Sequence, residues 1–445
     1  MPNYKTKEEI NYPYLSEPVS IYTYPNGHKI VIAKKDSHMA NISTWVKTGS
    51  INENSENNGV SHFLEHLMFK GTTKYKAGVF DRTLESKGAI INAATWKDYT
   101  YYYVTIPKRS FDTALHMHAD MMIDPIIPED EVGPAFDFNG EIPEQKRERY
   151  VVIEEIRMGK DNNWRKVYSA LNEAMYEKHP YKREVIGTGE IIASIPRDEV
   201  MRYYETFYTP DNLTTVVVGD FKDEEILEKL EKEFKFKDFS NIEKCATDEK
   251  IPEITIKNPQ YIEQKGDVNT GYLMVGFLCD SAKNLKETIA LDILSNILGE
   301  GKSSRLNSKF IESVKEPYVY QIETCHYQFK DGDNFFIEAV FDPTKKDEFI
   351  EEIKQELDKL ANITEDELKK AKKRAKVNFA QDAETVSDIA DSIGYYMTVC
   401  EDLKPAQNCL KTLDEIDTNY LSEIAAKYLN KNICSISTLL PKGDN

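Results

Sequence analysis

The sequence contains few cysteines, and their spacing is not that of metal ligands or of a disulfide framework. Only six occur among 445 residues, all after residue 240 and none in a Cys-x-x-Cys pair. Cysteine zinc sites and small disulfide-stapled domains both depend on closely spaced pairs. We therefore expect reduced, buried thiols and no metal site built from cysteine.

Long apolar runs and an excess of positive charge are also absent. No apolar run reaches the roughly 18 residues that a membrane-spanning helix requires. The first nine residues, Met-Pro-Asn-Tyr-Lys-Thr-Lys-Glu-Glu, contain no apolar signal region. We expect no membrane span and a cytoplasmic location, unless a leader was removed from this sequence. The net charge of −19 argues against nucleic acid as a partner and is compatible with peptide substrates.

What the chain does contain is a group of ionisable residues within the apolar segment Gly59–Thr72. The apolar spacing of this segment predicts a buried helix that follows an asparagine-rich loop. On a helix, His62, Glu65 and His66 share one face, because positions i, i+3 and i+4 are neighbours. Two imidazoles there can bind one metal ion, and Glu65 can act as a base towards a metal-activated water.

The alternative is that these histidines are ordinary core or surface residues with satisfied hydrogen bonds. Burying three ionisable groups on one apolar helix costs several kcal/mol unless something pairs them. The order His-x-x-Glu-His is also the inverted zinc-protease signature. We therefore favour a metal site, and the donor types favour zinc.

Two histidines leave the metal without a third protein ligand. The candidates are acidic residues on a helix predicted from Lys146 through Met158, namely Glu148, Glu154 and Glu155. Glu148 and Glu155 lie on the same face of that helix, whereas Glu154 is turned away by about 100°. The residues alone do not choose among these three.

The segment from His62 to Thr72 resembles the active-site helix of the M16 metallopeptidases, the pitrilysin, insulysin and mitochondrial processing peptidase family. Five further collinear segments resemble the same family, and together they span most of the chain: Asn92–Tyr103, Glu148–Arg157, His179–Thr188, Tyr208–Asp220 and Ser303–Leu306.

This resemblance implies a particular set of residue roles. Zinc would be held by His62, His66 and Glu155. Glu148 would contact the ligands and not the metal itself. Asn92 and Ala93 would lie at a strand edge that binds extended peptides; from the residues alone, a turn or bulge there is equally compatible. Tyr318 would help to hold the oxyanion of the reaction.

Two features depart from the family pattern. The interval between His66 and Glu155 is longer than usual, and the surplus maps to Gly133–Gln145, which we expect to be a surface loop able to shape access to the site. Ile311 stands where many relatives have an arginine, seven residues before Tyr318. Several relatives of this size work as dimers, so a homodimer or a heterodimer with another M16 chain is expected.

The order of predicted strands and helices indicates an α+β fold with two tandem, structurally similar αβ domains, each an antiparallel-rich sheet packed with helices. We assign residues 1–236 to a domain with the metal site, 237–262 to a linker and the start of a second domain, and 263–445 to a domain without the metal site. In the repeat, Asp292, Ser295 and Asn296 fall at the positions of His62, Glu65 and His66.

The leading hypothesis is a zinc endopeptidase that cleaves peptides or unfolded segments, with Glu65 as general base. The alternative, motivated by Ile311, is a non-catalytic or partner-dependent subunit of a heterodimeric processing peptidase.

Overall fold

The computed structural model describes residues 2–239, 243–247, 251–254, 259–279 and 284–442, and these form two compact units. The first unit consists of Met1–Arg157, Arg183–Lys250 and Phe379–Gln407. The second consists of Met158–Lys182, Ile251–Asn378 and Asn408–Asn445. Within the described ranges, no helix is long and apolar enough to cross a membrane.

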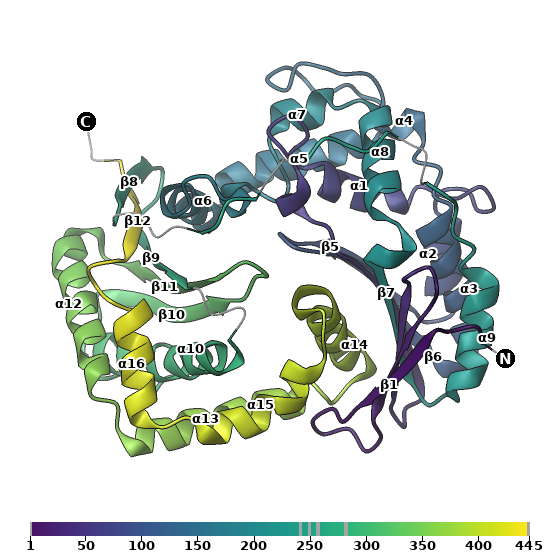
Figure 1. The fold of residues 1–445 in the computed structure, drawn as a ribbon. Coiled ribbons are helices and arrows are strands. Elements are labelled where there is room, and N and C mark those ends of the chain that lie inside the picture. The colour runs from purple at the N-terminus through teal and green to yellow at the C-terminus, as the bar shows by residue number, and fades with distance from the viewer. Residues whose placement is uncertain (1, 240–242, 248–250, 255–258, 280–283, 443–445) are drawn as a thin grey trace. The chain divides into compact units, whose positions relative to one another are not determined.

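The first unit is built on a seven-stranded sheet with the order β1-β2-β3-β7-β4-β6-β5 (Figure 1). Only β3 and β7 pair in parallel; the other neighbours are antiparallel. Strand β7 is buried along its whole length, as its Val-Val-Val run predicts for a central strand. The strands are β1 (Thr6–Ile10), β2 (Val19–Thr23), β3 (Lys29–Lys34), β4 (Met39–Val46), β5 (Ile90–Thr95), β6 (Thr100–Pro107) and β7 (Leu213–Gly219).

Helices cover one face of this sheet and bury a large apolar core between themselves and the strands. The core takes Phe63 from α1 and Val152 from α5, together with Ile42 and Val104 from the strands. These helices are α1 (Val60–Met68), α2 (Val79–Glu85), α3 (Phe111–Ile123), α4 (Glu129–Val132), α5 (Glu148–Asp161), α7 (Gly189–Ser194), α8 (Arg197–Phe207) and α9 (Asp223–Glu233).

The opposite face of the sheet packs against α14 (Val386–Tyr395), which comes from the C-terminal half of the chain. Trp45 of β4 and Ile389 of α14 belong to this second apolar cluster. A Cβ atom at Gly394 would lie only 2.0 Å from the Trp45 ring, so the close approach of helix and sheet requires glycine at this position.

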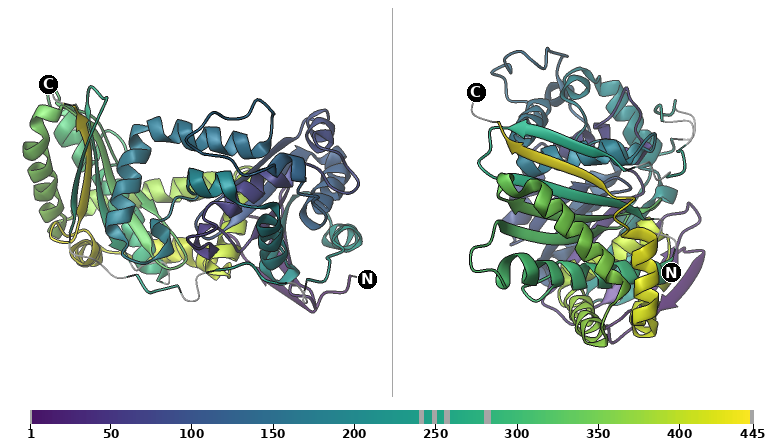
Figure 2. Two further views of the ribbon diagram at one scale, coloured as in Figure 1. Left: turned by 90° about the horizontal axis from the view of Figure 1, so that it is seen from above. Right: turned by 90° about the vertical axis from the view of Figure 1, so that its left-hand side faces the viewer.

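The second unit contains a five-stranded sheet with the order β10-β11-β9-β12-β8. Its strands are β8 (Tyr261–Gly266), β9 (Gly271–Cys279), β10 (Val319–Tyr327), β11 (Asp333–Phe341) and β12 (Ser435–Pro441). Figure 2 shows α12 and α16 lying across these strands. The helices are α6 (Asn163–Met175), α10 (Leu285–Leu298), α11 (Arg305–Asn307), α12 (Lys346–Asp358) and α16 (Thr418–Tyr428); α13 (Glu365–Gln381) and α15 (Lys404–Glu415) run across the division between the two units.

The two sheets share one topology, which confirms the predicted pair of similar αβ domains. The order β10-β11-β9-β12-β8 repeats β5-β6-β4-β7-β3, and the pairs β8–β12 and β3–β7 are both parallel. Helix α10 lies against β10 as α1 lies against β5. The repeat therefore extends from the sequence to the direction of every shared strand.

The units differ from the predicted contiguous domains, 1–236 and 263–445, in two helices. Helix α6 belongs to the second unit, where it packs on β9 and β12, and α14 belongs to the first. Each sheet has two apolar faces, and each takes the helix for one face from the other half of the chain. Parts of the predicted linker 237–262 lie outside the described residues.

Candidate metal centre

Helix α1 brings the three residues of the His-x-x-Glu-His segment to one side. Val60, Phe63, Leu64 and Leu67 are fully buried and anchor the helix in the core. The imidazole rings of His62 and His66 then lie 4.8 Å apart between centroids, at an angle of 64°. This spacing lets two ring nitrogens point towards one ion.

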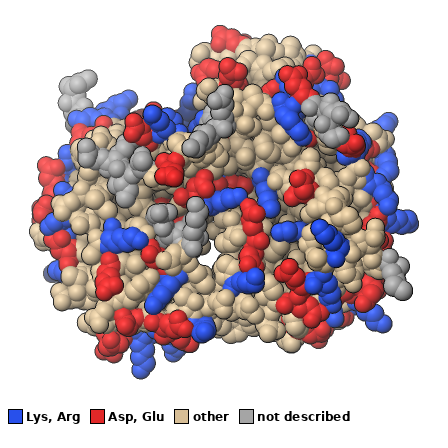
Figure 3. All heavy atoms as spheres, in the orientation of Figure 1, with Lys and Arg blue, Asp and Glu red and all other residues tan. Residues whose placement is uncertain are grey.

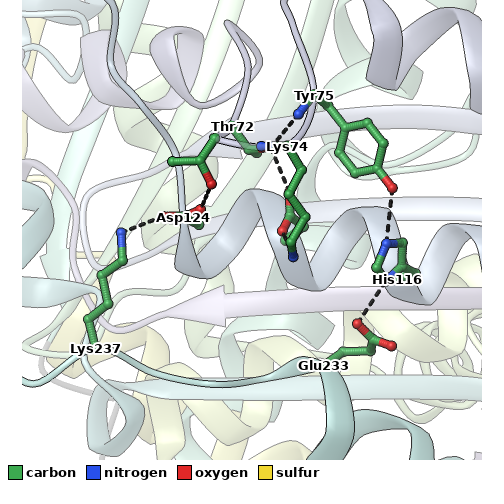
Figure 4. A network of polar contacts seen from close by, with 9 residues as sticks. Thr72, Lys74, Tyr75, His116, Asp124, Glu233 and Lys237 are labelled. Atoms are coloured by element: carbon green, nitrogen blue, oxygen red, sulfur yellow. Dashed lines mark hydrogen bonds and ion pairs between the residues drawn. The ribbon is translucent and has the colours of Figure 1, made fainter.

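The segment after α1 is held in place by a polar network, drawn in Figure 4. The hydroxyl of Thr72 donates to Asp120 of α3 at 2.6 Å, and Lys74 pairs with the same carboxylate. The ring of His116, also on α3, bonds to the Tyr75 hydroxyl at 3.0 Å and to Glu233 at 2.7 Å. These contacts fix the segment that follows α1 to α3.

Glu155 of α5 completes a group of three donors. Its Oε2 atom lies 3.7 Å from Nε2 of His66 and 4.0 Å from Nε2 of His62. One ligand atom from each of the three side chains lies within 4.8 Å of the others. Within the described ranges this is the only group of three such residues able to hold a metal ion. The structure thus brings together the three predicted ligands.

Of the other two acidic candidates, neither is arranged as a ligand. Glu148 accepts a hydrogen bond from Nδ1 of His66 at 2.9 Å and forms an ion pair with Lys70. A carboxylate at that ring nitrogen fixes the tautomer that leaves Nε2 free for a metal. Glu154 instead points to Arg157, at 3.4 Å, and is largely exposed.

The charges around His66 act on one another. Burial by itself would lower the pKa of His66, but Glu148, Glu65 and Glu155 outweigh it and the net direction is upward. Burial would likewise raise the pKa of Glu148, and here His66 and Lys70 turn the direction downward. A bound cation would replace the proton that this acidic surrounding otherwise favours on His66.

Glu65 is the buried acid of the group, with 9% of its surface exposed. The hydroxyl of Thr95 donates to its Oε2 atom at 2.5 Å, and the Thr95 backbone amide also bonds to it. Burial raises the pKa of Glu65, although Thr95 and His66 oppose the rise. A carboxylate with a raised pKa is a stronger base for a water molecule than an ordinary glutamate.

Thr95 is the last residue of β5, so the catalytic candidate Glu65 sits at the end of an edge strand. Among the described strands, β5 pairs only with β6, in continuous antiparallel register from Ile90 to Thr95. Asn92 and Ala93 are therefore part of a regular strand, and the alternative of a turn or bulge is wrong. That these two residues bind substrate stays a prediction.

The inserted segment Gly133–Gln145 contains no helix or strand, but it is not only a surface loop. Phe138 is buried at 5% exposure, and the Arg157 guanidinium lies 5.5 Å from its ring. Arg157 also donates to the carbonyl oxygens of Phe138 and Gly140, at 2.7 and 3.0 Å. The insertion is thus fastened to α5, two residues beyond Glu155, which corrects the expectation of a wholly superficial loop.

Tyr318 belongs to the second unit, directly before β10. Its ring lies against Phe310 and Phe349, and its hydroxyl is buried. Burial, aided by Glu352 and Glu348, raises its pKa to about 12. The predicted contact of Tyr318 with an oxyanion stays a prediction.

The second unit has the same arrangement of helix and edge strand as the candidate site, but with different side chains. The hydroxyl of Ser295 lies 3.0 Å from that of Thr324 on β10, a contact that parallels Glu65 and Thr95. Asp292, at the position of His62, bonds to the ring of His326 at 2.7 Å. The sequence alignment of the two halves therefore corresponds to equivalent places in the two folds.

Sequence reasoning missed four residues that support the site: Glu53, Lys70, Thr95 and Glu131. The amide of Glu148, at the start of α5, donates to Glu131 at 2.9 Å. Glu53, in the loop before α1, accepts the Gly59 and Ser61 amides at the start of that helix. The one signal for these contacts is that neither ligand helix begins with a conventional serine, threonine or aspartate cap.

Comparisons with known proteins indicate a single family over most of the chain. Residues 29–189 match the family model described as insulinase (peptidase family M16), and residues 194–375 match the model of the peptidase M16 inactive domain. The three candidate metal ligands lie within the first match and outside the second.

Individual relatives cover nearly all of the chain. The zinc protease PqqE of Helicobacter pylori is 30% identical over 93% of this chain and 91% of its own. The uncharacterized zinc protease YmxG of Bacillus subtilis is 27% identical over 95% of this chain and 98% of its own. The probable mitochondrial-processing peptidase subunit beta of Arabidopsis thaliana is 24% identical over 97% of this chain and 80% of its own.

The fold has solved counterparts as well. The crystal structure of a protease from Helicobacter pylori matches with a TM-score of 0.82 and 27% identity, covering 99% of this chain and all of that one. An M16-like peptidase from Alicyclobacillus acidocaldarius matches in fold with a TM-score of 0.80 at 20% identity, over 95% of this chain and 98% of that one. Family models, whole-length relatives and fold agree, and the chain belongs to peptidase family M16.

Proposed function

We propose that this protein is a zinc-dependent endopeptidase that cleaves peptides or unfolded segments. The observation that carries the proposal is the buried Glu65 carboxylate beside three convergent donors from His62, His66 and Glu155. Two imidazoles and one carboxylate are the protein ligands of many catalytic zinc sites, which keep a further position open. The names of the relatives, zinc proteases, support the same metal.

In this proposal each side chain has one task. Zinc supplies Lewis-acid activation of a water molecule. Glu65 accepts a proton from that water and later gives it to the leaving amine, while Thr95 holds its carboxylate in position. Glu148 keeps His66 in the required tautomer. Tyr318 is proposed to donate a hydrogen bond to the developing oxyanion.

The substrate is proposed to bind as an added strand along β5. The amide of Ala93 donates to the Asn92 side chain and not to β6, so it faces the open side of the strand. Because Thr95 at the end of β5 touches Glu65, a peptide paired with this edge would pass beside the metal donors. Main-chain pairing suits extended peptides of loosely defined sequence.

The first experiment replaces Glu65 with glutamine and measures hydrolysis of a quenched peptide library. We expect Glu65→Gln to abolish hydrolysis and to retain bound zinc, because glutamine cannot take the proton and the three donors are unchanged. Chelator should abolish the wild-type activity. Cleavage by a zinc-loaded Glu65→Gln variant would remove Glu65 from the mechanism.

A second candidate function is that of a partner-dependent subunit. Ile311 at the position of the usual arginine favours it, as do relatives named as beta subunits of the mitochondrial-processing peptidase. Measurement of the native mass, followed by peptide hydrolysis by the purified chain alone and with another M16 chain, separates the two. Turnover that begins only with the added chain supports the subunit, and turnover by a homogeneous homodimer or monomer opposes it.

On the face drawn in Figure 3, acidic and basic side chains are interspersed. That face therefore has no extended basic area of the kind that binds nucleic acid. This agrees with the proposal that the substrates are peptides.

A further inference from the structure

Helix α1 begins at a residue that cannot cap it. The N-cap is Gly59, in the left-handed conformation with φ 98°, and it has no side chain to accept the first amide hydrogens of the helix. Those amides have no acceptor within the helix and need one from elsewhere. A serine or aspartate at the N-cap is the usual solution.

Glu53, six residues before the N-cap, supplies the acceptor instead. Its Oε2 atom accepts the Gly59 amide at 2.8 Å, and its Oε1 atom accepts the Ser61 amide at 2.9 Å. The Ser61 hydroxyl donates to Oε1 and the Asn58 side-chain amide to Oε2, the latter at 2.7 Å. Both oxygens are thus occupied by donors from the start of the metal helix.

This carboxylate is completely buried, with 0% of the residue exposed. A buried carboxylate is costly unless charge-assisted hydrogen bonds compensate it, and the positive end of a helix adds to the compensation. Four donors from Asn58, Gly59 and Ser61 offset part of this cost. The complete set of hydrogen bonds therefore stabilises the start of α1. Loss of one donor or of the charge would leave a buried polar atom without a partner, which is destabilising.

Glu53 also joins α1 to the end of the edge strand. It follows the short helix η1 (Ser50–Asn52), in which the amides of Ser50 and Ile51 donate to the carbonyls of Trp96 and Lys97, at 3.3 and 2.9 Å. Trp96 comes directly after Thr95, which holds Glu65. Hydrogen bonds and short backbone links thus connect Thr95, through η1 and Glu53, to the first turn of α1.

We infer that Glu53 is a positioning residue that locks the first turn of α1, and with it His62, to the strand end that holds Glu65. The inference rests on the proposed metal site. His62 is the third residue of α1, whereas His66 lies one turn later and is also held by Glu148. Because each helical residue contributes 100° of rotation and 1.5 Å of rise, fraying of the first turn takes His62 out of the donor group.

The test compares Glu53→Gln with the wild type in a titration of zinc against a chromophoric chelator. Glutamine has the same shape, but its amide nitrogen must face one of the donors, which breaks that contact. We expect the affinity for zinc to fall about tenfold or more, as for other residues that orient metal ligands. Excess zinc should restore much of the peptide hydrolysis, because the variant keeps all three donors.

The second readout is amide hydrogen exchange in the metal-free protein. We expect faster exchange in Gly59–Leu67 of Glu53→Gln, with exchange in the central strand β7 unchanged. Asp223→Asn is the matched control: Asp223 is also a buried acid of the first unit, but it accepts from the Tyr22 hydroxyl, at 2.6 Å, and not from α1. This control should bind zinc as the wild type does.

Wild-type zinc affinity and wild-type exchange in Glu53→Gln would overturn the inference. If Glu53→Gln does not fold, Glu53→Asp keeps the charge but shortens the reach, and normal zinc binding by that folded variant would overturn it equally. A chain that binds zinc and cleaves no peptide would contradict the proposed function and leave the role of Glu53 intact. If no zinc binds, the exchange experiment decides alone.

Discussion

His326 of β10 is buried between two aspartates, at 1% side-chain exposure. Its Nδ1 atom lies 2.7 Å from Asp292 and its Nε2 atom 3.3 Å from Asp333. Burial alone would lower its pKa, but the two carboxylates outweigh burial and raise it to about 9. His326 is therefore held as an imidazolium beside Asp292, the residue of the second unit that is equivalent in sequence to His62.

This pair of contacts predicts a pH-dependent stability. The folded pKa is above the unfolded value of about 6.5, so the stabilisation is complete below that pH and is lost as the pH rises through about 9. We expect the free energy of unfolding of the wild type to fall by ~3 kcal/mol more than that of His326→Gln between pH 6 and pH 10. Denaturant unfolding across this range measures it.

The comparison with the variant is needed because other groups titrate in the same range. Burial lowers the pKa of Lys97 to about 8, for example, and this lysine is unchanged in His326→Gln. Parallel pH profiles for the two proteins would show that the ring of His326 is neutral in the folded state.

Also at the residue scale, the sequence predicts contacts along a helix far better than contacts between helices. The grouping of His62, Glu65 and His66 follows from helical spacing alone, and α1 has it. Glu155 could be chosen over Glu148 and Glu154 only through the family resemblance. Glu53 and Thr95 could not be found, because their contacts depend on how a loop and a strand end pack against α1.

At the scale of single elements, β5 is the strand whose backbone is open to an incoming chain. The Trp96 amide bonds to Tyr99 at 2.7 Å and closes the turn to β6, and ladder bonds alternate from there. The amides of Ala93 and Thr95 consequently face away from β6. One is held by Asn92 and the other by Glu65.

Replacement of Ala93 by proline should weaken substrate binding without disturbing the metal donors. Proline removes an amide that β6 does not use, and an edge strand tolerates it. We expect KM to rise several-fold to about tenfold, the value of one lost backbone hydrogen bond, with little change in zinc content. Ala93→Ser keeps the amide and serves as control; an equal KM for both variants would argue against strand addition at this edge.

The sequence predicted a helix within Gly59–Thr72, and α1 spans Val60–Met68. The insertion was harder, because a single buried aromatic residue, Phe138, has no periodicity to distinguish it from a surface residue.

At the scale of the whole molecule, each half of the chain supplies one helix to the unit that the other half mainly forms. Helix α14 covers Trp45, Val216 and Val218 of the first sheet, and α6 covers the equivalent face of the second. Residue patterns revealed two similar halves because each half has its own strands and helices. They could not reveal the exchange, because an amphipathic helix fits either sheet.

The exchange predicts that the halves cannot be separated at the linker. A fragment of residues 1–250 keeps every strand of the first sheet but lacks α14, and it should expose one apolar face. We expect it to aggregate or to bind a hydrophobic dye, and to regain a cooperative unfolding transition when residues 379–407 are fused to its C-terminus. A stable, monomeric 1–250 fragment, measured by sedimentation and calorimetry, would contradict this.

Because α14 spans Val386–Tyr395, every strand of the first sheet is synthesised long before the helix that covers Trp45. Until α14 has been synthesised, one apolar face of the first sheet stays exposed on the nascent chain. The order of these segments along the chain thus delays completion of the first unit, and places a demand on holding chaperones that a protein of independently folding modules would not make.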